Sequence, residues 1–304
     1  MDAPSHWKRS GEASPRPHRG APISWGVSET PGWGYQTAPL RVFQEMQSLG
    51  MRTSEMGPHG YFALDDVAEE IRGKDFTIVA GFVVLGFRFP GGLVNSSDDL
   101  ELTFGRLRDA GATFAVIAIA SDEADYESRP RLQGGQWRQV SDTLKAVQEI
   151  AERKGLQMVL HPHFGTFIET ADHACRILEQ SEVGLCLDTG HLALAGDDPL
   201  DLAERVPGRI KHVHLKDVDT DLAARVRGGD LSYHEAVKAG LFQPLGRGGA
   251  RIRQFVTHLE VSGYEGWYVL EQDVALPEEP PLGDGPMLNS KASLDYLAAI
   301  GLSL

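Results

Sequence analysis

Cysteine is scarce in this sequence. Among 304 residues only Cys175 and Cys186 are cysteines, and neither belongs to a Cys-x-x-Cys pair. A disulfide framework or a structural zinc site made of thiolates needs cysteines in closely spaced sets. The sequence therefore argues against both, and we expect two buried or half-buried thiols in a protein of a reducing compartment.

Excess positive charge is also absent. Lysine and arginine total 29 against 43 acidic residues, so the formal net charge is -14 at pH 7. A protein that binds nucleic acid needs a basic surface that neutralises phosphates. The composition thus predicts no nucleic-acid partner, and it also disfavours a strongly anionic substrate.

Long apolar runs are missing as well. No run reaches the length of roughly 20 residues that crosses a membrane as a helix. The first twenty residues are polar, with basic residues and prolines, and they lack the apolar core of a signal peptide. We expect residues 1–20 to form a flexible tail, the protein to be cytoplasmic, and no membrane to be its partner.

Short apolar runs alternate with longer amphipathic stretches after residue 20. Several runs are nearly continuous in valine, isoleucine and leucine, which is typical of parallel strands covered on both faces. The predicted strands are 22–27, 51–56, 76–85, 113–120, 156–161, 183–188, 210–215 and 267–271. The predicted helices are 39–49, 97–110, 137–154, 170–180, 199–205, 251–263 and 287–299.

Eight such units favour one α/β domain over residues 21–304, a single (β/α)8 TIM barrel. An open doubly wound sheet is the alternative, but no Gly-x-Gly-x-x-Gly motif follows the first predicted strand. Residues 220–249 predict a long insertion between strands seven and eight, with a short helix over 232–239. A long connection of this kind at the top of a barrel usually helps to build or cover the site.

Ligand-type side chains end four successive predicted strands. They are His161, Asp188, His214 and Glu271. In a barrel these strand ends point into one space, where such groups would repel or stay unpaired unless a cation held them. Imidazole mixed with carboxylate suits manganese, cobalt, iron or zinc better than calcium. The sequence therefore predicts one divalent metal ion as cofactor, and we expect Mn²⁺ or Co²⁺.

Three further residues are candidate catalytic groups. His163 follows His161 across a proline; it is an acid or base because histidine titrates near neutral pH, or else a loop histidine that faces solvent. Lys216 polarises a carbonyl or carries a proton, or else it pairs with Asp217. Glu55, near the end of the second predicted strand, is a base, a substrate ligand or a helix N-cap.

Three more are candidate substrate-binding residues. His191 comes three residues after Asp188 and either bonds a substrate hydroxyl or caps the next helix. His212 and His214 are two residues apart on one strand and face the same side; we expect His214 to be the ligand and His212 to lie behind it or touch substrate. Trp25, on the first predicted strand, walls the pocket or packs at the barrel mouth.

Three segments carry a resemblance to a known family: 185–191 (LCLDTGH), 210–217 (IKHVHLKD) and 269–273 (VLEQD). From about Ala21 to the last helix, the chain resembles the xylose isomerase-like barrels, which include sugar isomerases, epimerases and lyases. It looks most similar to the inosose (2-keto-myo-inositol) dehydratase branch, on residues 21–25, 53–55 and 161–166. The resemblance implies a metal held by the last four strands, which Asp188, His214 and Glu271 match.

Two departures from that family pattern favour a lyase. His161 stands where the isomerases and epimerases keep a glutamate, which is one of two proton-transfer bases in the epimerases. Asp219 and Thr220 occupy the region in which epimerases have an arginine.

The resemblance implies a metal-dependent lyase that dehydrates inosose, or a similar cyclic polyol ketone, through an enolate. His163, Glu271 or Glu55 would remove the proton, and His191 or Lys216 would assist the departing hydroxyl. A metal-dependent ketose isomerase or epimerase and a non-catalytic sugar-binding barrel stay open as alternatives. The expected partner is a small polyol or sugar, and a homodimer is expected by analogy.

Overall fold

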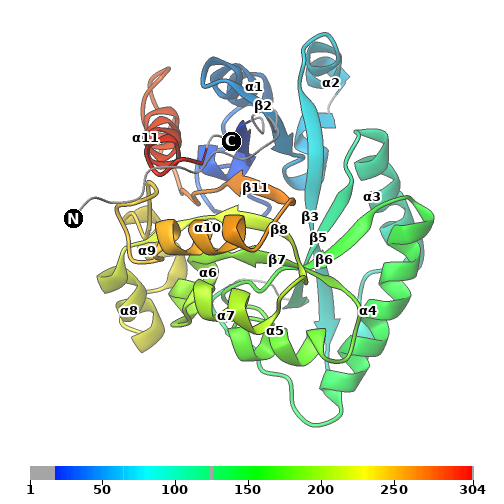
Figure 1. Cartoon of the computed structure of the whole chain (residues 1–304). Coiled ribbons are helices and arrows are strands. Elements are labelled where there is room, and N and C mark those ends of the chain that lie inside the picture. The colour runs from blue at the N-terminus through cyan, green and yellow to red at the C-terminus, as the bar shows by residue number, and fades with distance from the viewer. Residues whose placement is uncertain (1–17, 64, 123–125, 303–304) are drawn as a thin grey trace.

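A closed ring of parallel strands forms the centre of the molecule (Figure 1). The computed structural model describes residues 18–63, 65–122 and 126–302. Within these residues the ring contains eight strands: β1 (His18–Gly20), β2 (Met51–Glu55), β3 (Thr77–Arg88), β5 (Phe114–Ser121), β6 (Gln157–Leu160), β7 (Gly184–Asp188), β8 (Ile210–Leu215) and β11 (Trp267–Leu270). Parallel pairing of β1 with β11 and of β2 with β3 closes the ring. The predicted single (β/α)8 barrel is confirmed.

The first strand is not where the sequence predicts it. Residues 22–27 begin with a 3-10 helix, η1 (Pro22–Trp25), and β1 lies before it, within the expected tail. Pro22 has a fixed φ and no N–H to donate, so it suits the start of a helix better than a strand between two neighbours. Gly26 then ends the helix in the left-handed region, with φ 82. Residues 1–17 of the expected tail lie outside the described residues.

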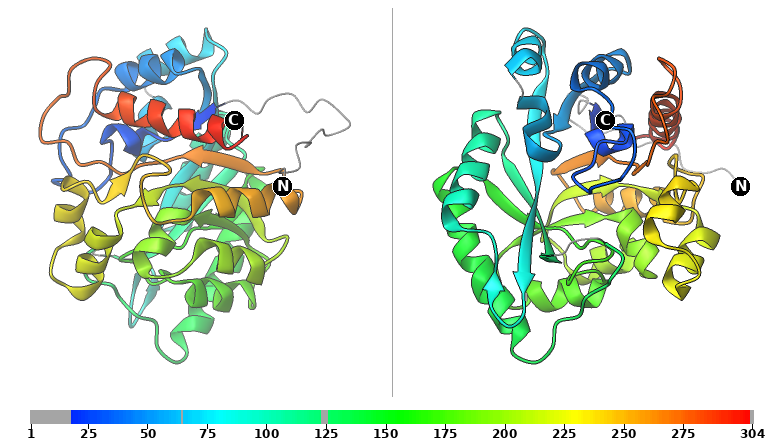
Figure 2. Two further views of the ribbon diagram at one scale, coloured as in Figure 1. Left: turned by 60° about the vertical axis from the view of Figure 1, so that its left-hand side comes forward. Right: turned by 180° about the vertical axis from the view of Figure 1, so that it is seen from behind.

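Seven predicted helices form within a few residues of their expected bounds and lie outside the ring (Figures 1 and 2). They are α1 (Pro39–Ser48), α3 (Ser97–Asp109), α4 (Gln136–Arg153), α5 (Ala171–Leu178), α7 (Pro199–Arg205), α10 (Ile252–Val261) and α11 (Pro286–Ala299). Local chemistry explains the agreement: α4 buries Val140, Leu144 and Val147 on one face. Helix α11 lies against η1, so the two ends of the described chain are close together.

Besides η1, four helical elements of the described chain were not expected from the sequence: η2 (Pro58–Ala63), α2 (Asp65–Arg72), α6 (Thr189–Ala195) and α8 (Thr220–Gly228). Each of the three α-helices among them has at most nine residues, and periodicity is a weak signal over so short a segment. None of the helices in the described part of the chain is long and apolar enough to cross a membrane.

The connection from β8 to α10 contains β9 (Asp217–Val218), α8, α9 (Tyr233–Lys238) and β10 (Phe242–Gln243), and β10 pairs antiparallel with β9. Helix α8, drawn in yellow, lies beside α6 (Figure 1). The Asp217 carboxylate accepts hydrogen bonds from the backbone N–H groups of Val218, Gly246, Gly248 and Ala250. One buried side chain at the start of this connection therefore holds the backbone of residues 246–250, at its end, close to β9.

Candidate active site

A cavity of about 420 Å³ opens where the ring strands end. This volume lies within the usual range for small-molecule sites. Seven of the predicted site residues line it: Glu55, His161, His163, His191, His214, Lys216 and Glu271. Three residues without a role in the sequence prediction line it too: Tyr126, Tyr233 and Asp273. The barrel thus brings most of the predicted site together in one place.

The carboxylate of Glu55 sets the orientation of two imidazoles. Its Oε1 atom is 2.7 Å from His212 Nε2 and 2.9 Å from His214 Nε2. Burial by itself raises the pKa of Glu55, but His214 and His212 outweigh burial and hold it below its ordinary value. An ionised carboxylate only accepts hydrogen bonds, so both Nε2 atoms carry protons. In a neutral ring, His214 Nδ1 is then left with a free lone pair.

That lone pair of His214 faces two carboxylates. Nδ1 is 2.8 Å from Glu271 Oε2 and 3.5 Å from Asp188 Oδ2. Asp188 Oδ1 accepts from the N–H groups of Gly190 and His191 at the start of α6. Its Oδ2, like His214 Nδ1, is buried without a hydrogen-bond partner among the described residues. Asp188, His214 and Glu271 form one group in which one ligand atom from each residue lies within 4.8 Å of the others.

This group fits a divalent cation. Three lone-pair donors so close together repel unless a proton or a metal ion lies between them. Burial lowers the pKa of His214, but Cys186, Glu271 and Glu55 outweigh burial and raise it well above the ordinary value. A proton on Nδ1 satisfies the group in part, and a metal ion can take its place. Glu55 behind His214 supplies the outer carboxylate that metal-binding histidines usually have.

The ammonium group of Lys216 lies at the edge of the same group. Its Nζ is 3.3 Å from Asp188 Oδ2, 3.1 Å from Glu271 Oε2 and 2.8 Å from Asp273 Oδ1. Burial lowers the pKa of Lys216, but Asp188, Asp273 and Glu271 outweigh burial and raise it well above the ordinary value. The side chain passes over Gly190, where a Cβ atom would lie 2.6 Å from Lys216 Cγ. The lysine is thus a fixed, charged part of the site.

Two histidines line the cavity beside Lys216. Lys216 Nζ is 3.2 Å from His191 Nε2; an ammonium only donates, so Nε2 accepts and Nδ1 carries the proton. His191 Nδ1 is buried and unpaired within the described chain. His163 Nδ1 is 2.7 Å from the Phe164 carbonyl oxygen and donates to it, which leaves Nε2 with a lone pair. Burial lowers the pKa of His163 to about 4.

His161 lines the cavity, but it belongs to other clusters of candidate metal ligands than the one that contains Asp188 and Glu271. Its ligand atoms fall within 4.8 Å of those of Cys186 and His214, and also of those of His163 and His191. Burial lowers the pKa of His161 well below its ordinary value. The expectation that His161 completes one four-residue metal set stays a prediction.

Trp25 and His212 are not among the residues that line this cavity in the described part of the chain, and their expected substrate contacts stay predictions. The Trp25 indole is buried beneath η1, and its Nε1 donates to Glu45 Oε2 at 2.7 Å. The proline-led turn that replaces the expected strand directs Trp25 into the core against α1. His212 is fully buried two residues before His214 on β8, and its Nε2 lies 2.7 Å from Glu55 Oε1.

Sequence reasoning missed Asp273 and Tyr233. Asp273 Oδ2 accepts a 3.0 Å hydrogen bond from the Tyr233 hydroxyl, while Oδ1 accepts from Lys216. Burial raises the pKa of Asp273 to about 6, although Lys216 opposes the shift. The signal for Asp273 was its position two residues after Glu271. Tyr233 gave no such signal, because it comes from α9, far from the ring strands in sequence.

Known proteins resemble this chain over most of its length. A family model described as a xylose isomerase-like TIM barrel matches residues 43–300. An inosose dehydratase of Geobacillus thermodenitrificans is 37% identical over 271 residues, which cover 84% of this chain and 90% of that protein. A rhizopine catabolism protein of Rhizobium meliloti is 31% identical over 293 residues, or 91% of this chain and 86% of that protein.

Solved structures share the fold. The probable 3-DHS dehydratase of Bacillus anthracis has a TM-score of 0.68 at 14% identity and covers 93% of this chain and 99% of its own. The IOLI protein, solved with a zinc atom, has a TM-score of 0.64 at 15% identity, with coverage of 95% and 99%. At these identities the likeness concerns the fold alone.

Proposed function

The chain belongs to the xylose isomerase-like TIM barrel family, and from that premise we propose that it is a divalent-metal-dependent lyase that dehydrates inosose or a similar cyclic polyol ketone. Inosose dehydratases are among its relatives at 30% identity or more. The observation that carries the proposal is the convergence of Asp188 Oδ2, His214 Nδ1 and Glu271 Oε2. We propose that these atoms hold the ion, and that it is Mn²⁺ or Co²⁺.

When bound, the ion would act as a Lewis acid that stabilises negative charge developing on the substrate carbonyl oxygen. The protein must then remove a proton from the carbon next to the carbonyl. We assign this step to His163, because its Nε2 lone pair is left free by the bond from Nδ1 to the Phe164 carbonyl. Glu55 suits the step less well, since its Oε1 already accepts from two imidazoles.

The departing hydroxyl needs a proton to leave as water. We assign this proton to His191, whose buried Nδ1–H lacks a partner among the residues described here. As Nδ1 gives up its proton, the Lys216 ammonium, 3.2 Å from Nε2, stabilises the negative charge left on the ring. The proton that His163 has taken from the substrate then returns to His191, whose ring centroid lies 3.8 Å from that of His163, so both histidines regain their starting state and Lys216 stays charged.

The test is dehydration of inosose by the metal-loaded protein, followed by the ultraviolet absorbance of the conjugated product. We expect water loss with Mn²⁺ or Co²⁺ and none after chelation. Glu271→Gln should lose both metal affinity and turnover, while Glu265→Gln, at an exposed position just before β11, should keep both. A panel of ketoses serves as the substrate control.

Two results would overturn this proposal. Deuterium exchange into a ketose without water loss indicates isomerase or epimerase chemistry. No turnover of any ketone, together with no affinity for divalent ions, indicates a sugar-binding barrel without catalysis.

A further inference from the structure

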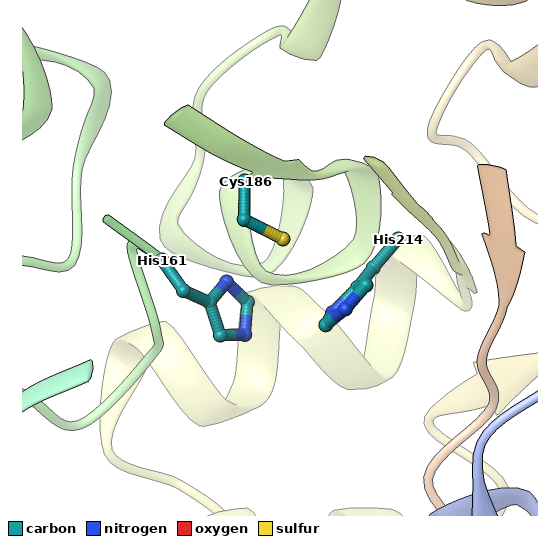
Figure 3. A group of neighbouring side chains, drawn as sticks. All are labelled: His161, Cys186 and His214. Atoms are coloured by element: carbon teal, nitrogen blue, oxygen red, sulfur yellow. The ribbon is translucent and has the colours of Figure 1, made fainter. Parts of the chain in front are cut away.

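Cys186 is buried beside two residues that line the active-site cavity, His161 and His214, and the sequence prediction assigned it no role there. It precedes Asp188 by two residues on β7, so both side chains face the interior of the barrel. Figure 3 shows its sulfur pointing toward the space between the rings of His161 and His214. The ligand atoms of these three residues lie within 4.8 Å of one another, and all three residues are buried.

Two ring nitrogens in this set need a partner. His161 Nδ1 and His214 Nδ1 are both buried without a hydrogen bond to any part of the chain that is described. His214 Nε2 is committed to Glu55, so Nδ1 is the only His214 atom left to bind an ion. Two imidazole nitrogens and one sulfur are a soft donor set, of the kind that zinc and related ions prefer over oxygen ligands.

The geometry needs only a small contraction. Ligand atoms about 2.1–2.3 Å from a tetrahedral ion lie roughly 3.4–3.8 Å apart, against the limit of 4.8 Å in this set. Rotation of the side chains about their own bonds can supply such a change. The thiol proton leaves to solvent as the sulfur–metal bond forms.

We propose that His161, Cys186 and His214 form a second cation site, which we call the inner site, and that it takes thiophilic ions such as Cd²⁺ and Zn²⁺. The outer set of Asp188, His214 and Glu271 offers two carboxylates and one imidazole and suits harder ions such as Mn²⁺. His214 belongs to both sets, and because its Nε2 bonds Glu55, its Nδ1 can bind only one ion. The two sites therefore exclude each other, and a thiophilic ion blocks the outer site by holding His214.

This inference goes beyond the proposed function, because it concerns different donors and a different class of ion. Its test is the thiolate-to-metal charge-transfer absorbance of the Cd²⁺-loaded protein. The chain contains two cysteines, so Cys175→Ser is a matched control for Cys186→Ser. We expect the absorbance band in the native protein and in Cys175→Ser, and no band in Cys186→Ser.

Binding titrations complete the test. Cys186→Ser should weaken Cd²⁺ binding by more than about 100-fold, the upper end of what loss of an outer-shell partner costs. Its Mn²⁺ affinity should stay unchanged, which also verifies that the variant is folded. Should Cys186→Ser fail to fold, Cys186→Ala replaces it. In the native protein, bound Cd²⁺ should prevent Mn²⁺ from binding, as followed by the paramagnetic resonance of free Mn²⁺.

Three outcomes overturn the inference. They are a Cd²⁺ complex without a charge-transfer band, a band that disappears in Cys175→Ser instead, and simultaneous binding of Cd²⁺ and Mn²⁺. None of them depends on turnover, so failure of the inner site is distinct from failure of the proposed lyase activity.

Discussion

Replacing Lys216 by methionine tests the charge balance of the site most directly. The ammonium lies within 3.3 Å of oxygens from Asp188, Glu271 and Asp273. Methionine keeps most of the apolar stem but leaves the buried carboxylates without this counter-charge. Removal of one partner of a buried ion pair typically costs about 3–5 kcal/mol. We expect a loss of this size in metal-free solution.

The loss converts into a change of melting temperature. At about 2.1 cal/mol/K per residue, a chain of 304 residues has an unfolding entropy of roughly 0.64 kcal/mol/K, so the expected decrease in Tm is about 5–8 °C. A divalent ion should restore more stability to Lys216→Met than to the native protein, because the ion no longer competes with a nearby ammonium for the same oxygens. At a free metal concentration of about 100 Kd, binding adds about 2.7 kcal/mol to the free energy of unfolding.

The assay is thermal unfolding with and without Mn²⁺, measured on three proteins. Lys211→Met is the control, because Lys211 is on the same strand but exposed, and surface substitutions usually change stability by less than about 0.5 kcal/mol. The reasoning is refuted if, in the presence of a chelator, Lys216→Met has the same Tm as the native protein. It is also refuted if Mn²⁺ raises the Tm of both proteins equally.

Three other substitutions make separate predictions. Asp188→Asn keeps the hydrogen bonds that Oδ1 accepts at the start of α6 but loses the negative charge. Calorimetry should show the affinity for Mn²⁺ reduced by more than about 100-fold, while the helical circular dichroism signal stays intact. An unchanged affinity would contradict the proposed ligand set. Gly190→Ala places a Cβ 2.6 Å from Lys216 Cγ and 2.7 Å from Lys216 Cβ, and it should cost about 1–3 kcal/mol in urea unfolding. In Lys216→Gly, which has neither atom, the same change should cost much less, and equal costs would exclude the clash. Tyr233→Phe removes the hydroxyl that donates to Asp273. We expect the free energy of unfolding to fall by about 1–3 kcal/mol and kcat to decrease. Native stability together with native turnover would contradict a positioning role for Tyr233.

The ring strands were predictable because parallel strands covered on both faces must be apolar along their length. The predicted strand 210–215 coincides with β8, and 113–120 differs from β5 (Phe114–Ser121) by one residue at each end. The first strand was not predictable in this way. β1 has three residues, His18–Gly20, of which only glycine lacks a polar side chain, so no apolar run marks it. The homodimer and the cytoplasmic location stay predictions.

Strand topology also made much of the site predictable. Polar residues at the ends of apolar strands must meet in a barrel, and Asp188, His214 and Glu271 do meet. Spacing along the chain could not reveal which atoms face one another. The orientation of His214 depends on Glu55, which lies on β2, far from His214 in the sequence.

The sequence by itself determined the barrel, the ends of its strands and the kinds of ligand gathered there, because these depend on local patterns of apolar and polar residues. Only the tertiary structure decided that Lys216 lies among three carboxylates, that Trp25 supports α1, and that the Cys186 thiol approaches His161 and His214. Such contacts depend on distances between side chains from different strands and helices. Those distances are set by the closure of the ring and by side-chain packing, which no single segment encodes.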